Sequence, residues 1–263
     1  MNLRIIIILA LLILPASLPA QLNDTINIID KNGKKQGHWI KKYPNGHIQY
    51  DGYFKDNKPT GTFRRFFEND TLRAILVFSN DGKTVDASIY GSNGRISSSG
   101  RFVNQRKEGK WSFFSSGIEG YLICEEEYSN NLKNGLSLKY YADKTLAERL
   151  NYSNDIRSGE WLQYYPGGKI FLKASYTDGK LQGEFEVFFK DGKPRYSGHY
   201  KDDMRDGFWN SYNPDGSLKY SIEYVGGIAK NSDLYKRESD YLDSLEMNKG
   251  KFSDPEKTGT IWQ

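Results

Sequence analysis

Residues 159–182 read GEWLQYYPGGKIFLKASYTDGKLQ, residues 183–206 read GEFEVFFKDGKPRYSGHYKDDMRD and residues 207–230 read GFWNSYNPDGSLKYSIEYVGGIAK. The three segments align without a gap, so the chain repeats with a period of 24 residues. Extending the alignment toward the N-terminus gives eight units over residues 37–230, which begin at Gly37, Gly61, Val85, Gly109, Gly135, Gly159, Gly183 and Gly207. A fixed period of this length indicates an array in which each unit packs on its neighbours.

The second half of every unit has an aromatic residue at the same position: Phe54, Phe78, Phe102, Tyr128, Tyr152, Tyr176, Tyr200 and Tyr224. In the first unit this residue closes an alternating run, in which positions 48, 50, 52 and 54 share one face of a strand. Alternation of period two predicts a strand with one buried and one solvated face. Turn sequences such as Pro166-Gly167-Gly168 separate it from a preceding G-x-W-x-x-Y-Y strand, so each unit is predicted to be a β-hairpin.

The predicted fold is therefore all-β: an elongated, twisted antiparallel β-meander of about eight 24-residue hairpin repeats, with about 16 strands. The two extra residues of the fourth unit fit in the turn at 115–120. A leading strand within residues 21–36 is expected to cover the first edge of the sheet. Within residues 231–263, a short helix from Ser232 to about Asn248 is expected to cover the last edge, followed by a loose tail.

Residues 1–20 have the layout of a secretory signal peptide. One positive charge at Arg4 precedes an apolar run from Ile5 to Leu14, and Pro15 and small residues follow. About ten apolar residues are too few to span a bilayer, which needs roughly 20. The sequence therefore predicts export to the periplasm, the cell envelope or the medium, with cleavage after Ala20, and no integral membrane protein.

The overall composition excludes several classes of protein. The 263 residues are 37% hydrophobic and 27% charged, as in a globular chain, and the net charge of +4 does not indicate a nucleic-acid binder. The single cysteine, Cys124, cannot form an internal disulfide, and the alternation predicts that it faces the buried side. The fold must then be held by packing and backbone hydrogen bonds.

The pattern G-x-W-x-x-Y-Y-P-N-G-K…Y-x-D-G-K resembles the MORN repeat in its bacterial variant form. The resemblance covers residues 37–230 and is strongest in units one, six, seven and eight. It is weakest in unit three, where Val85 and Ala87 replace the glycine and the aromatic residue, and in unit five, where Ser137 replaces the aromatic. The resemblance implies a hairpin-built sheet that binds proteins or membrane surfaces without shared catalytic residues. Some bacterial members of the family are described as antitoxin-like.

No catalytic, metal or cofactor constellation emerges from the sequence. His38, His47 and His199 occupy different repeat positions and have no metal-ligand spacing. No G-x-S-x-G motif, Cys-His order or phosphate-binding loop is present. We therefore predict no metal, no cofactor and no small-molecule substrate.

Two carboxylates are the exception to this pattern. Glu126 occupies a column that is otherwise glycine, alanine, leucine or isoleucine, and Glu148 also lies in a mostly apolar or small column. Two inward carboxylates near the insertion could mark a ligand pocket or, if they flank a cleft, a glycosidase site. The alternative is a locally open groove in two degenerate units.

Positive charge is concentrated near the N-terminal end of the array. Residues 31–65 contain nine lysines and arginines against two aspartates, a net +7 in a chain of +4. The candidate binding patch consists of Lys34, Lys35, Lys41, Lys42, Lys55, Lys58, Arg64 and Arg65. Such a patch either docks on an anionic surface, lipid or protein, or serves as solubilising charge that deters strand pairing at the edge.

Three functions remain open at this point. The first is a non-enzymatic exported scaffold that binds a protein or an envelope surface. The second is a cell-wall or glycan-binding module whose exposed rings stack on sugars or cage ammonium groups. The third is an enzyme that uses Glu126 and Glu148. The direction of the Trp and Tyr columns separates the second from the first, because buried rings cannot form a repeating cage.

Overall fold

The computed structural model describes residues 25–230, which form one open antiparallel sheet of 19 strands without a helix. The strands are β1 (Ile28–Ile29), β2 (Lys35–Lys42), β3 (Ile48–Lys55), β4 (Lys58–Phe66), β5 (Leu72–Phe78), β6 (Thr84–Tyr90), β7 (Ile96–Val103), β8 (Arg106–Phe114), β9 (Leu122–Ser129), β10 (Leu132–Tyr140), β11 (Leu146–Ser153), β12 (Ile156–Tyr164), β13 (Ile170–Thr177), β14 (Lys180–Leu181), β15 (Gly183–Phe188), β16 (Pro194–Lys201), β17 (Met204–Tyr212), β18 (Leu218–Val225) and β19 (Ile228–Ala229). The all-β meander predicted from the sequence is confirmed. The predicted helix at 232–248 lies outside the described residues.

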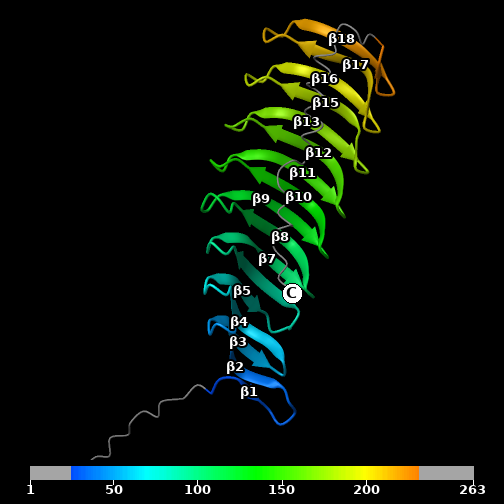
Figure 1. Cartoon of the computed structure of the whole chain (residues 1–263). Helices are drawn as coiled ribbons and strands as arrows, with labels where there is room; N and C mark the ends of the chain where they lie inside the picture. Colours follow the sequence, from blue (N-terminus) through cyan, green and yellow to red (C-terminus); the bar gives the residue numbers. More distant parts are fainter. Residues whose placement is uncertain (1–24, 231–263) are drawn as a thin grey trace, which may run out of the picture.

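The strands follow one another across the sheet in the order of the chain. Neighbours in sequence pair antiparallel, and β14 and β15 together form the strand that pairs with β13. Figure 1 shows the result: a long, twisted stack of strands that runs from β1 at one end to β18 at the other, as a single layer. At the first end β1 pairs with β2 through Ile28 opposite Gln36 and Ile29 opposite Lys35.

Tight turns with left-handed backbone join one repeat to the next. Both central residues have positive φ in the turn between β3 and β4, 51° at Asp56 and 68° at Asn57, which is the type I′ geometry that matches the twist of a hairpin. Asn57 also ties this turn to the start of β2, because its N–H donates to the carbonyl of Lys35 and its Oδ1 accepts from the N–H of Lys35. The sequence favours Asn, Asp and Gly at these turns because only they adopt this conformation cheaply.

In most repeats the opening residue is a glycine that interrupts the strand ladder. Gly207 has φ of 71°, and the register between β16 and β17 shifts across this residue. Val85 is the one unit-opening residue without a positive φ, and β5 and β6 pair through it with no shift. The degeneracy of unit three therefore has a structural consequence: this step of the meander lacks the bulge that the other repeats use to bend and twist.

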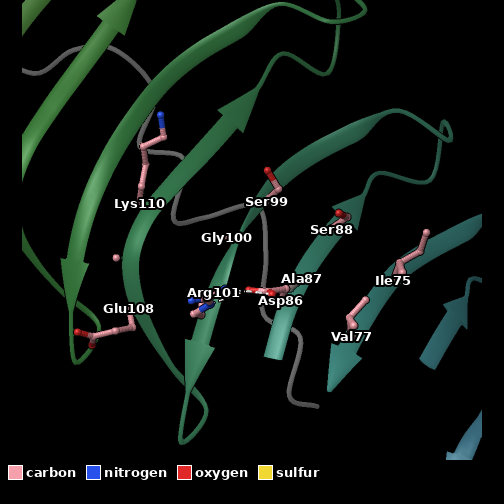
Figure 2. A pocket seen from close by; sticks show the side chains of 11 residues that line it. Ile75, Val77, Asp86, Ala87, Ser88, Ser99, Gly100, Arg101, Glu108 and Lys110 are labelled. Carbon is pink, nitrogen blue, oxygen red and sulfur yellow. Dashed lines mark hydrogen bonds and ion pairs between the residues drawn. The ribbon is translucent and has the colours of Figure 1, made fainter. Parts of the chain in front are cut away.

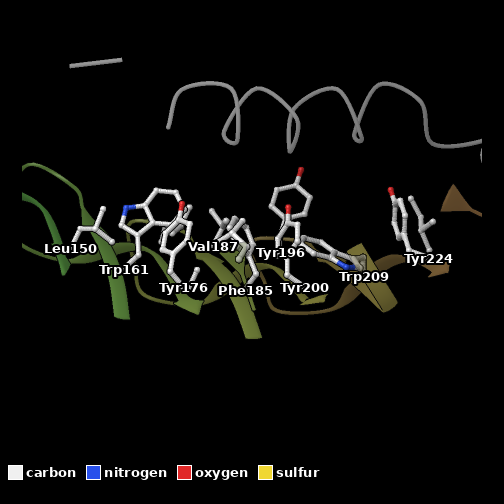
Figure 3. Close-up of a cluster of buried hydrophobic side chains, with 13 residues drawn as sticks. Leu150, Trp161, Tyr176, Phe185, Val187, Tyr196, Tyr200, Trp209 and Tyr224 are labelled. Atoms are coloured by element: carbon white, nitrogen blue, oxygen red, sulfur yellow. The ribbon is translucent and has the colours of Figure 1, made fainter. Parts of the chain in front are cut away.

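Large side chains are buried on one face of the sheet, here called the aromatic face; the opposite face is called the polar face. The exposure of β13 alternates strictly from residue 172, with Leu172, Ala174 and Tyr176 buried and the residues between them exposed. The buried side chains form two clusters, one between Phe63 and Tyr128 and one between Leu150 and Tyr224. Figure 3 shows rings of the second cluster rising from the same side of the sheet.

Glycines on the aromatic face lie beneath the rings of the following hairpin. A Cβ added at Gly52 would lie 2.1 Å from the Phe63 ring, and one at Gly198 would lie 2.2 Å from the Trp209 ring. The third such pair is Gly100 with Trp111, at 2.3 Å. These glycines thus provide space for an aromatic ring.

The two degenerate units compensate for their missing rings. Ala87 replaces the aromatic residue of unit three, and the residue opposite it is Leu76 rather than glycine. Ser137 replaces the aromatic of unit five, and the residue opposite it is Glu126. Leu76 and Glu126 are 3% and 2% exposed, so both fill the space that the smaller neighbour leaves.

We expect Gly198→Ala to lower the free energy of unfolding by about 2–3 kcal/mol, because the added methyl group forces the Trp209 ring out of place. Urea denaturation measures the loss. Ser175→Ala on the polar face of β13 is the control and is expected to change stability by less than about 0.5 kcal/mol. In a Trp209→Ala background the cost of Gly198→Ala should disappear, and an equal cost in both backgrounds would contradict the packing argument.

Candidate functional site

The eight basic residues of the predicted patch lie on or next to three strands at the β1 end of the sheet. Lys34 precedes β2, and the others belong to β2, β3 or β4. The register divides them between the two faces. Lys41 and Arg65 lie on either side of Tyr50 on the aromatic face, whereas Arg64 lies opposite Asp51 on the polar face. The patch therefore surrounds the end of the sheet instead of covering one face.

Lys35 has a structural role that the sequence did not reveal. Its Nζ lies 4.6 Å from the Trp39 ring centroid and 4.9 Å from that of Phe54, and it donates to the Tyr50 hydroxyl at 3.1 Å. Cations stack on rings at the same repeat position elsewhere on the aromatic face, namely Lys107, Lys133, Arg157 and Arg205. Lys35 belongs to this column, and cation–π contact and packing account for its position.

Most of the remaining patch has no ionic partner among residues 25–230. Lys34 lies 3.8 Å from Asp56. Over the described range no ion pair joins Lys41, Lys42, Lys55, Lys58 or Arg64 to a carboxylate, and all five are exposed. Some cations farther along the sheet are paired, as in Lys110 with Glu125 at 2.6 Å. The β1 end thus carries uncompensated positive charge.

Glu126 and Glu148 face inward, as the alternation predicts, and each is paired with a lysine. Glu126 accepts from Lys133 Nζ at 3.0 Å and from the Tyr128 hydroxyl at 2.6 Å. Glu148 lies 2.8 Å from Lys139 Nζ and accepts hydrogen bonds from Gln163 and Trp161. Neither lysine was predicted from the sequence. The available signal was a lysine on the neighbouring strand, Lys133 opposite Tyr128 and Lys139 opposite Glu148.

This arrangement does not provide the acid of a glycosidase pair. Burial acts to raise the pKa of Glu148, but the charge of Lys139 and the hydrogen bonds outweigh it and hold that pKa below its ordinary value. A general acid needs a raised pKa to keep its proton near neutral pH. The cavity beside Glu148 has a volume of only about 10 Å³, room for one water molecule and no sugar.

An open depression on the polar face spans β5 to β8. It has a volume of about 450 Å³, and small side chains form its floor, since Ser88 and Ser99 lie directly opposite each other. Figure 2 shows Asp86 and Arg101 side by side on the two middle strands, with Arg101 Nε donating to Asp86 Oδ1 at 2.7 Å. Lys110 pairs with Glu125 and Glu108 accepts from the Asn130 N–H, so the charged groups of the depression already have partners and offer little for an ionic ligand.

The histidines and the cysteine have ordinary surroundings. His38 is 2.7 Å from Asp51 and stacks on Tyr53, and His47 Nδ1 lies 2.8 Å from the carbonyl oxygen of Glu68. His199 is exposed, and Cys124 is a buried free thiol. In the part of the chain that the structure describes, no group of three His, Cys, Asp or Glu residues could hold a metal ion.

The Trp and Tyr side chains that recur in the repeats are buried on the aromatic face. Trp111, Trp161 and Trp209 are 1–2% exposed, and Tyr128, Tyr176, Tyr200 and Tyr224 are likewise buried. A repeating cage for sugars or ammonium groups needs accessible rings. This burial removes the observation on which the glycan-binding alternative depended.

An open, single-layer antiparallel sheet built from hairpin repeats defines an all-β repeat protein. Three stretches, residues 35–56, 157–178 and 181–202, match the family model of the MORN repeat variant. They correspond to units one, six and seven, so the chain carries MORN-variant repeats, as the sequence pattern predicts. MORN repeats often bind proteins or membranes, and the family is generally non-enzymatic. No curated protein matches the chain. Residues 25–230 contain no helix long and apolar enough to cross a bilayer.

Removing the Glu148 charge is expected to destabilise the protein in a pH-dependent way. Because the folded-state pKa is lowered, the stabilisation is present above the ordinary value of 4.5 and is lost as the pH falls through the lowered pKa. Glu148→Gln should therefore cost about 3 kcal/mol at neutral pH, where Lys139 is left without its counter-ion, and progressively less in acid. Urea denaturation across this pH range measures both values.

Glu160→Gln is the matched control for this experiment. Glu160 is 41% exposed and pairs with Arg149 at 2.9 Å, so its loss should cost less than about 1 kcal/mol. A Glu148→Gln effect that is no larger than the control, or that does not change with pH, would show that the buried pair contributes little.

Proposed function

We propose that this chain is an exported, non-enzymatic repeat scaffold whose β1 end binds an anionic partner at the cell envelope. The observation that carries the proposal is the group of exposed cations without an ionic partner in the described range, Lys41, Lys42, Lys55, Lys58 and Arg64, on β2–β4. A cluster of like charges repels itself, and an anionic partner relieves this repulsion. The leader-like residues 1–20 and the MORN-variant repeats support the same function.

The rest of the molecule supports a binding role over catalysis. The two inward carboxylates are neutralised by lysines, and the cavity beside one of them is too small for a substrate. The extended sheet instead offers a long, rigid surface held by contacts between neighbouring strands. Such a body is suited to holding its two ends at a fixed separation.

Reversing Lys41, Lys42, Lys55 and Lys58 to Glu should abolish binding to envelope fractions while leaving the fold intact, because all four side chains are exposed. Wild-type binding should fall at least about tenfold as the salt concentration rises to about 0.5 M, since exposed charges are then strongly screened. A sedimentation assay with envelope fractions measures both effects. Lys34 and Lys35 are left unchanged because they contact Asp56 and the Trp39 ring.

The matched control reverses four exposed lysines elsewhere on the sheet, Lys169, Lys173, Lys190 and Lys201. Its net charge changes by the same amount, so retained binding would assign the effect to the β1 end. Binding that survives the first reversal and high salt would show that the basic end is not the contact.

Export makes a separate prediction. The N-terminus of the protein recovered from the envelope or the medium should be Gln21, because cleavage after Ala20 removes the apolar run. Intact-mass measurement of the protein recovered from cell fractions tests this. Recovery of the uncleaved chain from the cytoplasm alone would refute export.

A further inference from the structure

The β1 end carries exposed aliphatic side chains next to its unpaired cations. Ile26, Ile28 and Ile29 are 46%, 41% and 61% exposed. They lie on or beside the two-residue edge strand, which Figure 1 places at the extreme end of the stack. Exposed isoleucines in a row are unfavourable in water, and their position beside lysines gives this rim an amphipathic character.

At this rim, exposed isoleucines and cations lie on both faces of the sheet. Ile28 and Ile29 are neighbours in a strand and therefore point to opposite faces. The cations are divided in the same way, with Lys41 on the face of Tyr50 and Arg64 on the face of Asp51. A partner that covered only one face would leave half of these groups in water, whereas a flat surface that meets the end of the sheet approaches both faces at once.

Many backbone N–H and C=O groups of β2 at this edge are already hydrogen-bonded. The Asn27 N–H donates to the His38 carbonyl oxygen at 2.8 Å, and the Asn27 Oδ1 accepts from the Ile40 N–H at 2.9 Å. Together with β1 these bonds cover most of β2, so few main-chain groups remain for a protein strand that would extend the sheet. The edge is thus poorly suited to strand addition, while its side chains remain available.

We propose that the β1 end is a membrane-docking rim for an anionic lipid bilayer. Ile26, Ile28 and Ile29 enter the boundary between headgroups and acyl chains, and the cations of β2–β4 contact lipid phosphates. Clustered basic residues are attracted to anionic leaflets, and the apolar side chains add an attraction that salt does not screen. The inference rests on the proposed function and names its partner. Because contact is through the end of the sheet, the repeats project away from the membrane.

The test uses the chain from Gln21 onward, because residues 1–20 would themselves enter a bilayer and every described strand begins after residue 24. Partitioning is measured onto phosphatidylcholine vesicles with and without phosphatidylglycerol, at low and high salt. Ile26→Ser/Ile29→Ser should weaken binding to the anionic vesicles about tenfold and remove the part that persists in high salt. The matched control is Ile156→Ser/Ile228→Ser, which removes isoleucines that are 52% and 74% exposed elsewhere and should leave binding unchanged.

A second measurement tests the orientation. An environment-sensitive fluorophore on Ile29→Cys should shift to the blue when anionic vesicles are added, whereas the same label on Ile228→Cys should not. The buried thiol of Cys124 is inaccessible to the label in the folded protein. Equal shifts at both positions would overturn end-on docking.

The outcomes separate this inference from the proposed function. Salt-sensitive vesicle binding that is unaffected by the Ile26→Ser/Ile29→Ser pair would overturn the membrane rim and leave an electrostatic contact. Binding to a polyglutamate resin but not to anionic vesicles would also overturn it and identify an acidic protein as the partner. Binding to neither, with no binding to envelope fractions, would refute the proposed function as well.

Discussion

The contact between an aromatic ring of one hairpin and a small residue of the hairpin before it holds the array together. Residues 25–230 form a single layer, so among them each ring on the aromatic face packs against side chains of its own and neighbouring strands. Gly52, Gly100 and Gly198 leave that space for Phe63, Trp111 and Trp209. Ring-to-ring contacts such as Tyr200 with Trp209, 5.0 Å between centroids, then continue the packing along the sheet.

The irregular units follow the same constraint. Where a ring is absent, at Ala87 and Ser137, the opposite strand supplies a larger side chain, Leu76 or Glu126. Glu126 is a negative charge among the buried side chains of the aromatic face. Lys133 forms an ion pair with it, and the Tyr128 hydroxyl donates a hydrogen bond to it. The same region divides the buried side chains into two clusters, with Glu148 and Lys139 between them. The carboxylates are therefore best understood as parts of a polar junction within the core.

The partners of the cationic side chains differ from one part of the sheet to another. On the aromatic face cations stack on rings, as Arg205 does on Tyr224, or pair with buried carboxylates, as Lys139 does with Glu148. On the polar face Arg101 pairs with Asp86. At the β1 end several cations lack such partners, and isoleucines beside them are exposed. Exposed isoleucines are unfavourable in water, and clustered like charges repel one another. Both features favour the β1 end as the surface that binds a partner.

Much of the fold could be predicted from the sequence because its signals are local. The 24-residue period, the alternation and the Asn, Asp and Gly turns specify hairpins, and short connections leave a meander as the simplest arrangement. The basic residues and the inward carboxylates were also visible in the sequence. Their partners were not, because the contact of Lys35 with the Trp39 and Phe54 rings, and that of Lys139 with Glu148, depend on register and on side-chain reach across strands. Likewise, the division of the basic patch between two faces was decided only by the tertiary structure, through the register that places Lys41 and Arg65 on one face and Arg64 on the other.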